Sequence, residues 1–433
     1  MRQSFGRRTL VGGALLLGAV LPGAAAIADP IQTVFVISME NQNWTQPANQ
    51  FTGGQQQVFQ NPAAHFLNSL TGGTATAVID GTPTNISSQT AYASAKHNVL
   101  STPTGANPSI HPSEPNYIWS EAGSNLGVLN DNEPFGPGGT NQNTTNHLST
   151  YLTQAGKSWK SYQEDTDLAV DGSGKLTSTV LPQNQWSVPL HNVSGSNAAY
   201  VNPYNGSNQY NYAVKHNPMA YFTDTNGGND TTPSNPLASH YAPLQQLQID
   251  LGNHTVANYN WITPNQFNDM HNALPGGFNY DGTLYTGDQA RIAQGDNFLK
   301  MIIPMIMASD AYKNDGAIVI WWDETESDGS GNANDFNHTI GEIVISPDAH
   351  PNVNGMPYVS PIDYTHSSDL LTMQEIFHVG PTGGIGDAAN ATDLADLFAP
   401  DAIPDGIPEP RTMPLTLLGL GLIGFAARRR TIA

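Results

Sequence analysis

Four apolar runs that do not alternate with polar residues occur along the chain, at residues 33–37, 258–262, 317–322 and 342–345. Uninterrupted runs of this length are typical of strands that are covered on both faces, as in a parallel sheet. The segments 167–212 and 222–240 are instead rich in Asn, Gly, Ser and Thr and show no lasting period. We expect them to be long loop insertions at the surface.

Helical spacing of apolar residues predicts helices between and after these runs. Asp296 is a candidate cap for a helix over residues 297–312, and Ser367 or Ser368 for a helix that ends near Phe377. Strands that alternate with helices predict the α/β fold class. The expected architecture is a doubly wound α/β/α sandwich with a mostly parallel central sheet.

Two of the apolar runs end in acidic, oxygen-rich pairs. Glu40 and Asn41 follow the first run, and Asp323 and Glu324 follow the third. Ligands bind beyond the carboxyl ends of the strands in an open parallel sheet, so these distant pairs can converge there on one divalent cation. The pattern therefore indicates metal-assisted chemistry.

A serine between two prolines is a candidate nucleophile. Ser113 lies in the segment His-Pro-Ser-Glu-Pro-Asn-Tyr at 111–117, whose prolines favour an extended, turn-prone backbone. If a helix opens near Tyr117, Ser113 lies at its N-terminus, where backbone N–H groups favour anions. A serine that only caps a helix fits the same residues, and this segment alone does not separate the two interpretations.

The composition restricts the chemistry further. The 433 residues include no Cys, so any metal must be held by oxygen and imidazole. The formal net charge is −21, and between residues 29 and 410 there are only seven Lys and one Arg, Arg291. Nucleic acid is not expected as a partner, because its binding requires clustered basic residues. A bound phosphate would rely on a metal or on imidazole in place of arginine.

The N-terminus resembles an export signal. Residues 1–28 combine three arginines with an apolar stretch and small residues up to Ala28, a layout typical of a cleaved signal peptide. The Arg7-Arg8 pair raises the twin-arginine route, although Gly6 before it departs from the usual pattern. Ordinary secretion fits equally well.

The C-terminal residues 401–433 contain a linker and an apolar tail. The sequence Pro-Glu-Pro at 408–410 precedes an apolar stretch over 414–427 and then three arginines. This order resembles the PEP-CTERM sorting signal of Gram-negative bacteria, so we expect sorting machinery as a partner and a location in the periplasm, at the cell surface or in the extracellular matrix. A marginal helical anchor is the alternative, although the stretch is short for a bilayer span, which needs about 20 residues. Residues 29–400 remain as one catalytic domain.

Six motifs follow one another between residues 31 and 380. They are Ser-Met-Glu-Asn-Gln-Asn at 38–43, His-Pro-Ser-Glu-Pro-Asn-Tyr at 111–117, Lys-His-Asn-Pro at 215–218, Pro-Asn-Gln-Phe-Asn-Asp-Met-His at 264–271, Trp-Trp-Asp-Glu at 321–324 and Tyr-Thr-His-Ser-Ser at 364–368. Together they resemble the bacterial and fungal phosphoesterase family. That family contains secreted acid phosphatases and phospholipases C and belongs to the alkaline-phosphatase-like superfamily. The resemblance implies an alkaline-phosphatase-like fold for the predicted sandwich.

The resemblance also implies a metal site and a nucleophile. Ser113 occupies the place of the nucleophile, and Asn116 would donate to a phosphoryl oxygen. The residues that would hold a divalent metal beside Ser113 are Glu40, Asn41, Asp323 and Glu324. The superfamily's second site is built from Asp and His, and Asp269, His271 and His338 match it. Glu324 stands where the wider superfamily has His, and related acid phosphatases work with one metal. The resemblance therefore implies one metal ion, or two if the second site is also filled.

Imidazole and ammonium groups complete the expected site. A protonated His271 or His338 would donate to the leaving group, since imidazole titrates near neutral pH. Further substrate contacts are expected from Lys215, His216, His111 and His366. His216 and His366 could equally be ordinary residues at helix ends.

The sequence therefore predicts an exported, metal-dependent phosphomonoesterase of acid phosphatase type that acts on a small phosphate ester through a phosphoserine. A phospholipase C-like phosphodiesterase that cleaves a phospholipid headgroup would use the same machinery. A non-catalytic surface matrix or carbohydrate-binding protein on the same fold is the alternative of another class, suggested by the insertions and the tail. The intact metal ligands and Ser113 argue against it, because a binding module needs neither.

Overall fold

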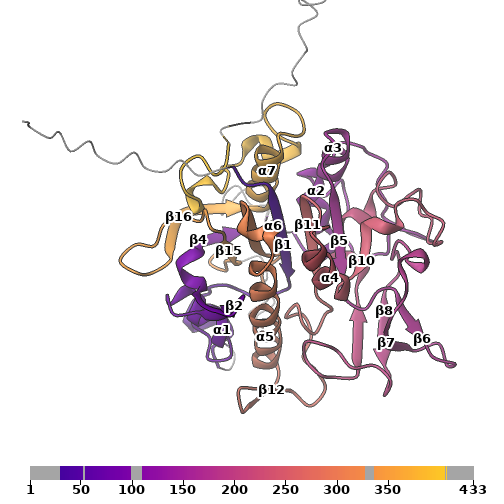
Figure 1. The fold of residues 1–433 in the computed structure, drawn as a ribbon, viewed down its shortest axis with the longest axis horizontal. Coiled ribbons are helices and arrows are strands. Elements are labelled where there is room, and N and C mark those ends of the chain that lie inside the picture. Colours follow the sequence, from indigo (N-terminus) through magenta and orange to yellow (C-terminus); the bar gives the residue numbers. More distant parts are fainter. Residues whose placement is uncertain (1–29, 52–53, 99–109, 327–335, 405, 407–433) are drawn as a thin grey trace, which may run out of the picture.

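The computed structural model describes residues 30–51, 54–98, 110–326, 336–404 and 406. The predicted export segment 1–28 and the tail from residue 407 onward lie outside these residues. Within them, eight strands form one central sheet (Figure 1). In order across the sheet they are β10 (Tyr241–Pro243), β5 (Trp159–Gln163), β11 (Tyr259–Thr263), β1 (Thr33–Met39), β14 (Gly316–Trp322), β15 (Glu342–Ile345), β4 (Thr90–His97) and β16 (Tyr358–Thr365).

Strand direction confirms the predicted sheet type. Neighbouring strands are parallel, except that β15 runs antiparallel to both β14 and β4. The carboxyl ends of the other strands therefore lie along one edge. The residues that precede β15 lie at the same edge, because that strand enters the sheet from there.

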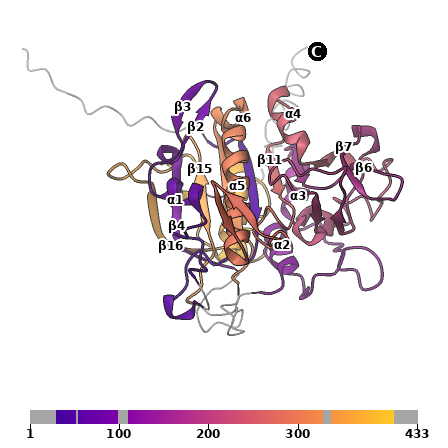
Figure 2. The same cartoon turned by 90° about the horizontal axis from the view of Figure 1, so that it is seen from below.

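Helices cover both faces of the sheet (Figures 1 and 2). Along β1, Val36 belongs to the apolar cluster on one face and Phe35 to the cluster on the other, as the period of a strand requires. One face carries α2 (Ser113–Ala122), α3 (Leu148–Gln154) and α7 (His366–Phe377), and the other carries α1 (His65–Thr71), α4 (Gln245–Asn253), α5 (Asp288–Met307) and α6 (Asp310–Lys313). The molecule is thus the expected α/β sandwich.

All four apolar runs lie in strands, but both predicted helix starts are wrong. Helix α5 begins at Asp288, so Asp296 lies in its interior. Helix α7 begins at His366 and is capped by Thr365, whose side chain forms a capping box with Ser368. Asp296 caps another helix instead. Its carboxylate accepts hydrogen bonds from the backbone N–H groups of Phe66 and Leu67 in α1, at 2.7 and 2.8 Å.

The insertions contain regular structure of their own. Two-stranded hairpins pair β6 (Leu168–Val170) with β7 (Leu176–Val180), and β8 (Val193–Ser196) with β9 (Gln209–Tyr212). Further hairpins pair β2 (Thr76–Ile79) with β3 (Thr82–Asn85), and β12 (Phe278–Tyr280) with β13 (Thr283–Tyr285). Among the described residues, no helix combines the length and apolar character that a membrane span needs.

Candidate active site

Two acidic pairs meet at the carboxyl edge of the sheet. Strands β1 and β14 are neighbours in parallel register up to Met39 and Trp322, so Glu40 and Asp323 leave the sheet side by side. The backbone N–H of Asn41 donates to Asp323 Oδ1 at 3.1 Å. The structure therefore brings together residues that are 282 positions apart.

Ser113 is the first residue of α2, and its hydroxyl lies between the two acidic pairs. Its Oγ is 3.1 Å from Glu40 Oε2 and 3.3 Å from Glu324 Oε1. Lys215 Nζ lies 3.3 Å from the same oxygen. The helix opens earlier than Tyr117, with Pro115 in its first turn, where a missing N–H costs nothing. A buried serine thus faces two carboxylates and one ammonium at a helix N-terminus.

Amide groups line the same cluster. Asn116 Nδ2 donates to Glu324 Oε2 at 3.2 Å and to the Ile110 carbonyl at 2.9 Å. The amide of Asn41 faces Glu40 and Glu324, and its nitrogen is 3.1 Å from an oxygen of each when the NH₂ group is turned toward them. His111 Nδ1 lies 2.9 Å from Glu324 Oε2, and its side chain is 25% exposed. His111 therefore lies where the cluster opens to solvent.

A histidine bridges two of the buried carboxylates. His216 Nε2 is 3.2 Å from Glu40 Oε1, and its Nδ1 is 3.3 Å from Asp269 Oδ2. Burial opposes the charged ring, but the charge of Glu40 and the hydrogen bond to Asp269 outweigh it and raise the pKa of His216 to about 9. Burial alone would raise the pKa of the Glu40 carboxyl. The positive charges of His216 and Lys215 outweigh this effect and lower that pKa to about 2.

The negative charge of the other acidic pair, Asp323 and Glu324, is poorly compensated by nearby cationic groups. Burial, followed by the charges of Glu40 and Glu324, raises the pKa of Asp323 well above its usual range. Burial also raises the pKa of Glu324, although His111 opposes this shift. Asp323 Oδ2 is buried and has no hydrogen-bond partner among the described residues. The site thus holds more negative charge than its own cations neutralise.

This donor set fits a hard divalent cation. Carboxylate and amide oxygens are the ligands that such ions prefer, and an added positive charge would relieve the repulsion between Glu40, Asp323 and Glu324. The side chains are not arranged as a finished cage. Within the described ranges, no group of three or more His, Cys, Asp or Glu side chains is placed to enclose a metal ion.

Of the remaining predicted residues, His271 and His366 contact residues of this cluster, whereas the contact of His338 is to Gln50. The backbone N–H of His271 donates to Asp269 Oδ1 at 2.8 Å, and burial lowers the pKa of the His271 ring. His366 is fully buried, and its Nε2 lies 2.6 Å from the backbone oxygen of Asp323, so it supports the acidic turn. His338 contacts Gln50 at 2.7 Å, and its role as a proton donor stays a prediction.

Two residues that contact this site have no role predicted from the sequence. The hydroxyl of Tyr117 donates to Glu40 Oε1, and its ring stacks on His216 at 5.1 Å between centroids. Helical spacing could have indicated Tyr117, because it follows Ser113 by one helical turn. Asp131, which binds Lys215 at 2.9 Å, lies in a loop with no pattern that would have identified it.

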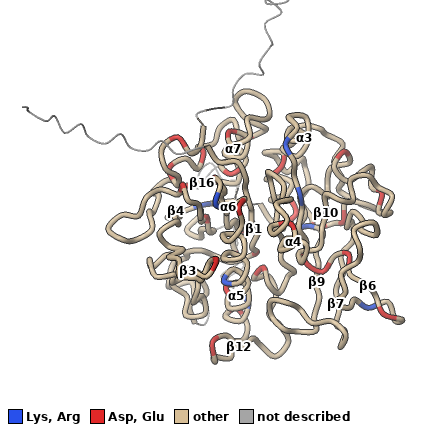
Figure 3. The backbone as a smooth tube through the Cα atoms, viewed as in Figure 1, with Lys and Arg blue, Asp and Glu red and all other residues tan. Residues whose placement is uncertain are grey.

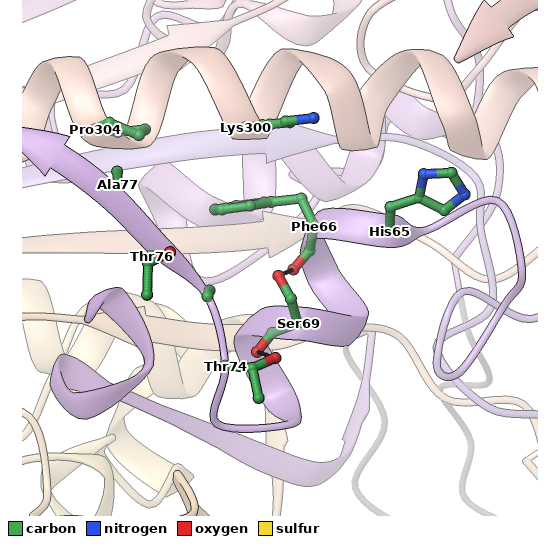
Figure 4. Close-up of a pocket in the computed structure, with 9 residues that line it drawn as sticks. His65, Phe66, Ser69, Thr74, Thr76, Ala77, Lys300 and Pro304 are labelled. Atoms are coloured by element: carbon green, nitrogen blue, oxygen red, sulfur yellow. Dashed lines mark hydrogen bonds between the residues drawn. The ribbon is translucent and has the colours of Figure 1, made fainter. Parts of the chain in front are cut away.

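A separate cavity of about 390 Å³ lies between α1, β2 and α5 (Figure 4). Its residues include His65 and Lys300, which both pair with Asp281, at 3.0 and 3.4 Å. None of the residues around Ser113 lines it.

Figure 3 shows how sparse lysine and arginine are along the described part of the chain. The positive charge at Ser113 comes from Lys215 and His216.

Comparison with known proteins identifies the family of this chain. The model of the phosphoesterase family matches residues 32–380. The chain belongs to the phosphoesterase family. A second model, the PEP-CTERM protein-sorting motif, matches residues 406–430. Both resemblances inferred from the sequence are confirmed.

Two curated proteins that are named as acid phosphatases are similar to this chain. A probable acid phosphatase of Kluyveromyces lactis is 24% identical over 294 residues, covering 66% of this chain and 55% of that protein. A phosphate-repressible acid phosphatase of Penicillium chrysogenum is 23% identical over 217 residues, covering 50% of this chain and 39% of that protein. The matches thus span about half, or less, of the length of these relatives.

A solved structure from work on the metabolism of multiple glycosaminoglycans by Bacteroides thetaiotaomicron also matches this chain. It is 9% identical, has a TM-score of 0.39, and the match covers 86% of this chain and 76% of that chain. At that TM-score the likeness adds nothing to the strand order described above.

Proposed function

We propose that the chain is an exported, divalent-metal-dependent phosphomonoesterase of the acid phosphatase type that works through a phosphoserine at Ser113. The observation that carries the proposal is the position of the Ser113 hydroxyl at the N-terminus of α2, within hydrogen-bond distance of Glu40, Glu324 and Lys215. Membership of the phosphoesterase family and the two acid phosphatase relatives support a phosphate ester as substrate.

Four oxygen donors would hold the metal ion: Glu40, Asp323, Glu324 and the side-chain oxygen of Asn41. The amide of Asn41 already faces Glu40 and Glu324, so a turn of the amide group presents its oxygen in the same direction. Asp269 with His271 and His338 remains the candidate set for a second ion. A bound divalent cation supplies Lewis-acid stabilisation of the serine alkoxide and of charge on the phosphoryl group.

The residues around Ser113 supply the rest of the chemistry. Glu40 and Glu324 both lie where they can accept the proton of the Ser113 hydroxyl. Lys215 and the dipole of α2 favour a phosphoryl group at the same place, because both attract its oxygens. Asn116 would donate to one of these oxygens. His216 stays protonated between Glu40 and Asp269 and holds those carboxylates in place.

The leaving group needs a proton from a nearby acid. His271 remains the candidate beside Asp269, although burial lowers its pKa and favours the neutral ring. An incoming phosphate anion would act in the opposite direction and raise that pKa. His338 remains the second candidate.

Export is the remaining part of the proposal. The PEP-CTERM motif over residues 406–430 is a protein-sorting motif, and the N-terminal residues 1–28 have the composition of a cleaved signal. Together they support secretion from a Gram-negative cell, with sorting machinery acting at the tail.

The stereochemical course of hydrolysis tests the proposed mechanism. Two in-line displacements, first by Ser113 and then by water, retain the configuration of an isotopically chiral phosphate monoester, whereas one direct attack by water inverts it. We expect retention, and inversion would exclude a phosphoserine. Parallel assays with p-nitrophenyl phosphate, bis-p-nitrophenyl phosphate and phosphatidylcholine separate a monoesterase from a phospholipase C-like diesterase.

A further inference from the structure

The helix that carries Ser113 lacks a cap of its own. The residue before α2 is Pro112, whose side chain makes no capping hydrogen bond. The first N–H groups of a helix have no partner within the helix, so an outside acceptor is required. Asp131 provides one, because its Oδ1 accepts from the backbone N–H of Glu114 at 3.0 Å.

The second oxygen of Asp131 holds the cation beside the nucleophile. Lys215 Nζ donates to Asp131 Oδ2 at 2.9 Å and lies 3.3 Å from Ser113 Oγ. The Lys215 side chain is 13% exposed and that of Asp131 is 32% exposed, so the pair lies at the border between the site and solvent. One carboxylate therefore contacts both the helix of Ser113 and the ammonium that faces Ser113.

The two residues that follow Asp131 are themselves fixed by contacts with distant parts of the chain. Tyr221 OH donates to the Asn132 carbonyl at 3.1 Å. The next carboxylate, Glu133, accepts from the backbone N–H of Asn192 at 2.8 Å. Asp131 thus has anchored neighbours and a contact with the Glu114 N–H in addition to its contact with Lys215.

We infer that Asp131 is a positioning residue that aligns Lys215 with the Ser113 hydroxyl, and this inference rests on the proposed function. A long lysine side chain has many rotamers, and a carboxylate at hydrogen-bond distance restricts them. Asp131 binds neither the proposed metal nor the phosphoryl group. Its charge repels a phosphate anion, so its contribution should be to turnover and not to substrate affinity.

Three variants separate alignment from helix capping. D131N keeps an oxygen that can cap α2, since Asn and Asp are equivalent caps, but it removes the charge that holds Lys215. D131A removes both functions, and D131E restores the charge on a longer side chain. A matched control is D250N, because Asp250 Oδ2 binds Lys160 at 2.7 Å on α4 and β5. We expect D250N to leave kcat unchanged.

Steady-state kinetics with p-nitrophenyl phosphate and the full chain give the first result. D131N and D131A should lower kcat by about tenfold or more, with KM unchanged or lower. D131E should recover part of the lost kcat. D131N should keep the wild-type melting temperature, because its side chain still caps α2. In a K215A background, D131N should change kcat less than twofold. An equal loss of kcat in both backgrounds, or no loss in either, would overturn the inference.

A crystal structure of D131N gives a result that does not depend on turnover. Lys215 Nζ should lie beyond hydrogen-bond distance of Ser113 Oγ in that variant. A lysine that stays at its wild-type position would overturn the alignment role. If the wild-type protein hydrolyses no phosphate ester, the proposed function fails, while this structural result still decides the inference.

Discussion

The hydroxyl of Ser113 lies 3.1 Å from Glu40 Oε2, although 73 positions separate the two residues in the chain. The contact exists because β1 ends at Met39 and α2 begins at Ser113, both at the carboxyl edge of the sheet. The hydroxyl and the carboxylate are fully buried, so neither is hydrogen-bonded to bulk water. A serine in this position can transfer its proton to a carboxylate when the proposed cation stabilises the alkoxide, and this underlies the first prediction.

Replacing Ser113 by Ala should lower kcat by about 10³-fold or more while folding and metal content stay unchanged. The variant removes only the attacking oxygen, because the site around it is built from other side chains. A matched control is Ser120→Ala in the same helix, whose hydroxyl donates to the Tyr117 carbonyl at 2.7 Å. Wild-type turnover by Ser113→Ala would refute the nucleophile assignment.

Replacing Asp323 by Ala should reduce bound metal and activity together. Asp323 lies among the charges of Glu40 and Glu324, so its removal takes one ligand from the proposed ion. Asp296→Asn is the control, because that carboxylate is equally buried but caps α1. Because both oxygens of Asp296 accept from backbone N–H groups and Asn has only one acceptor oxygen, the change should cost about 1–3 kcal/mol of stability and leave metal content unchanged. Elemental analysis that shows an unaltered metal-to-protein ratio in Asp323→Ala would exclude the site.

A glycine inside α5 should prove necessary for the loop that carries Asp269. A Cβ atom added at Gly295 would lie 2.3 Å from Met270 Cγ and 2.8 Å from Met39 Cε. Gly295→Ala should therefore cost about 1–3 kcal/mol of stability and lower activity, because Met270 follows Asp269 directly. In α4, a Cβ at Gly252 would meet no atom within 4 Å. Gly252→Ala should leave stability unchanged or raise it by up to about 1 kcal/mol. If thermal unfolding shows equal changes in stability for Gly295→Ala and Gly252→Ala, close packing at Gly295 is contradicted.

The start of α5 was not predicted from the sequence. Its pattern predicts a helix over residues 297–312 capped by Asp296, whereas α5 begins at Asp288 and places both Gly295 and Asp296 in its interior. The strands were predictable because both faces of the sheet are covered, which leaves unbroken apolar runs such as Phe35 to Ile37. The acidic pairs were predictable from their places after such runs. Asp131 was not, because its partners Glu114 and Lys215 are contacts made only in the folded chain.

The stability of the fold should depend on pH through Glu164. Burial, and then the charge of Asp165, raises the pKa of Glu164 from 4.5 to about 8. A carboxyl whose pKa is raised by folding stabilises the fold fully below its unfolded pKa, and this contribution is lost as pH rises through the folded pKa. The stability that the wild-type protein gains from protonated Glu164 should therefore be complete below about pH 4.5 and disappear toward pH 8.

The variant Glu164→Gln isolates that contribution. Its amide cannot ionise, so its melting temperature should depend less on pH than that of the wild type between about pH 4.5 and 8. The measurement is the difference in melting temperature between the two proteins across this range. A difference that stays constant with pH would show that Glu164 does not titrate as expected.

The most direct measurement of the central claim is rapid quenching of the wild-type enzyme in neutral denaturant during turnover of a phosphate monoester, followed by mass spectrometry of its peptides without exposure to acid. The account predicts one phosphoryl group, carried by Ser113, which forms during turnover and is absent before substrate is added. A phosphoryl group on a histidine or on any other side chain would contradict it.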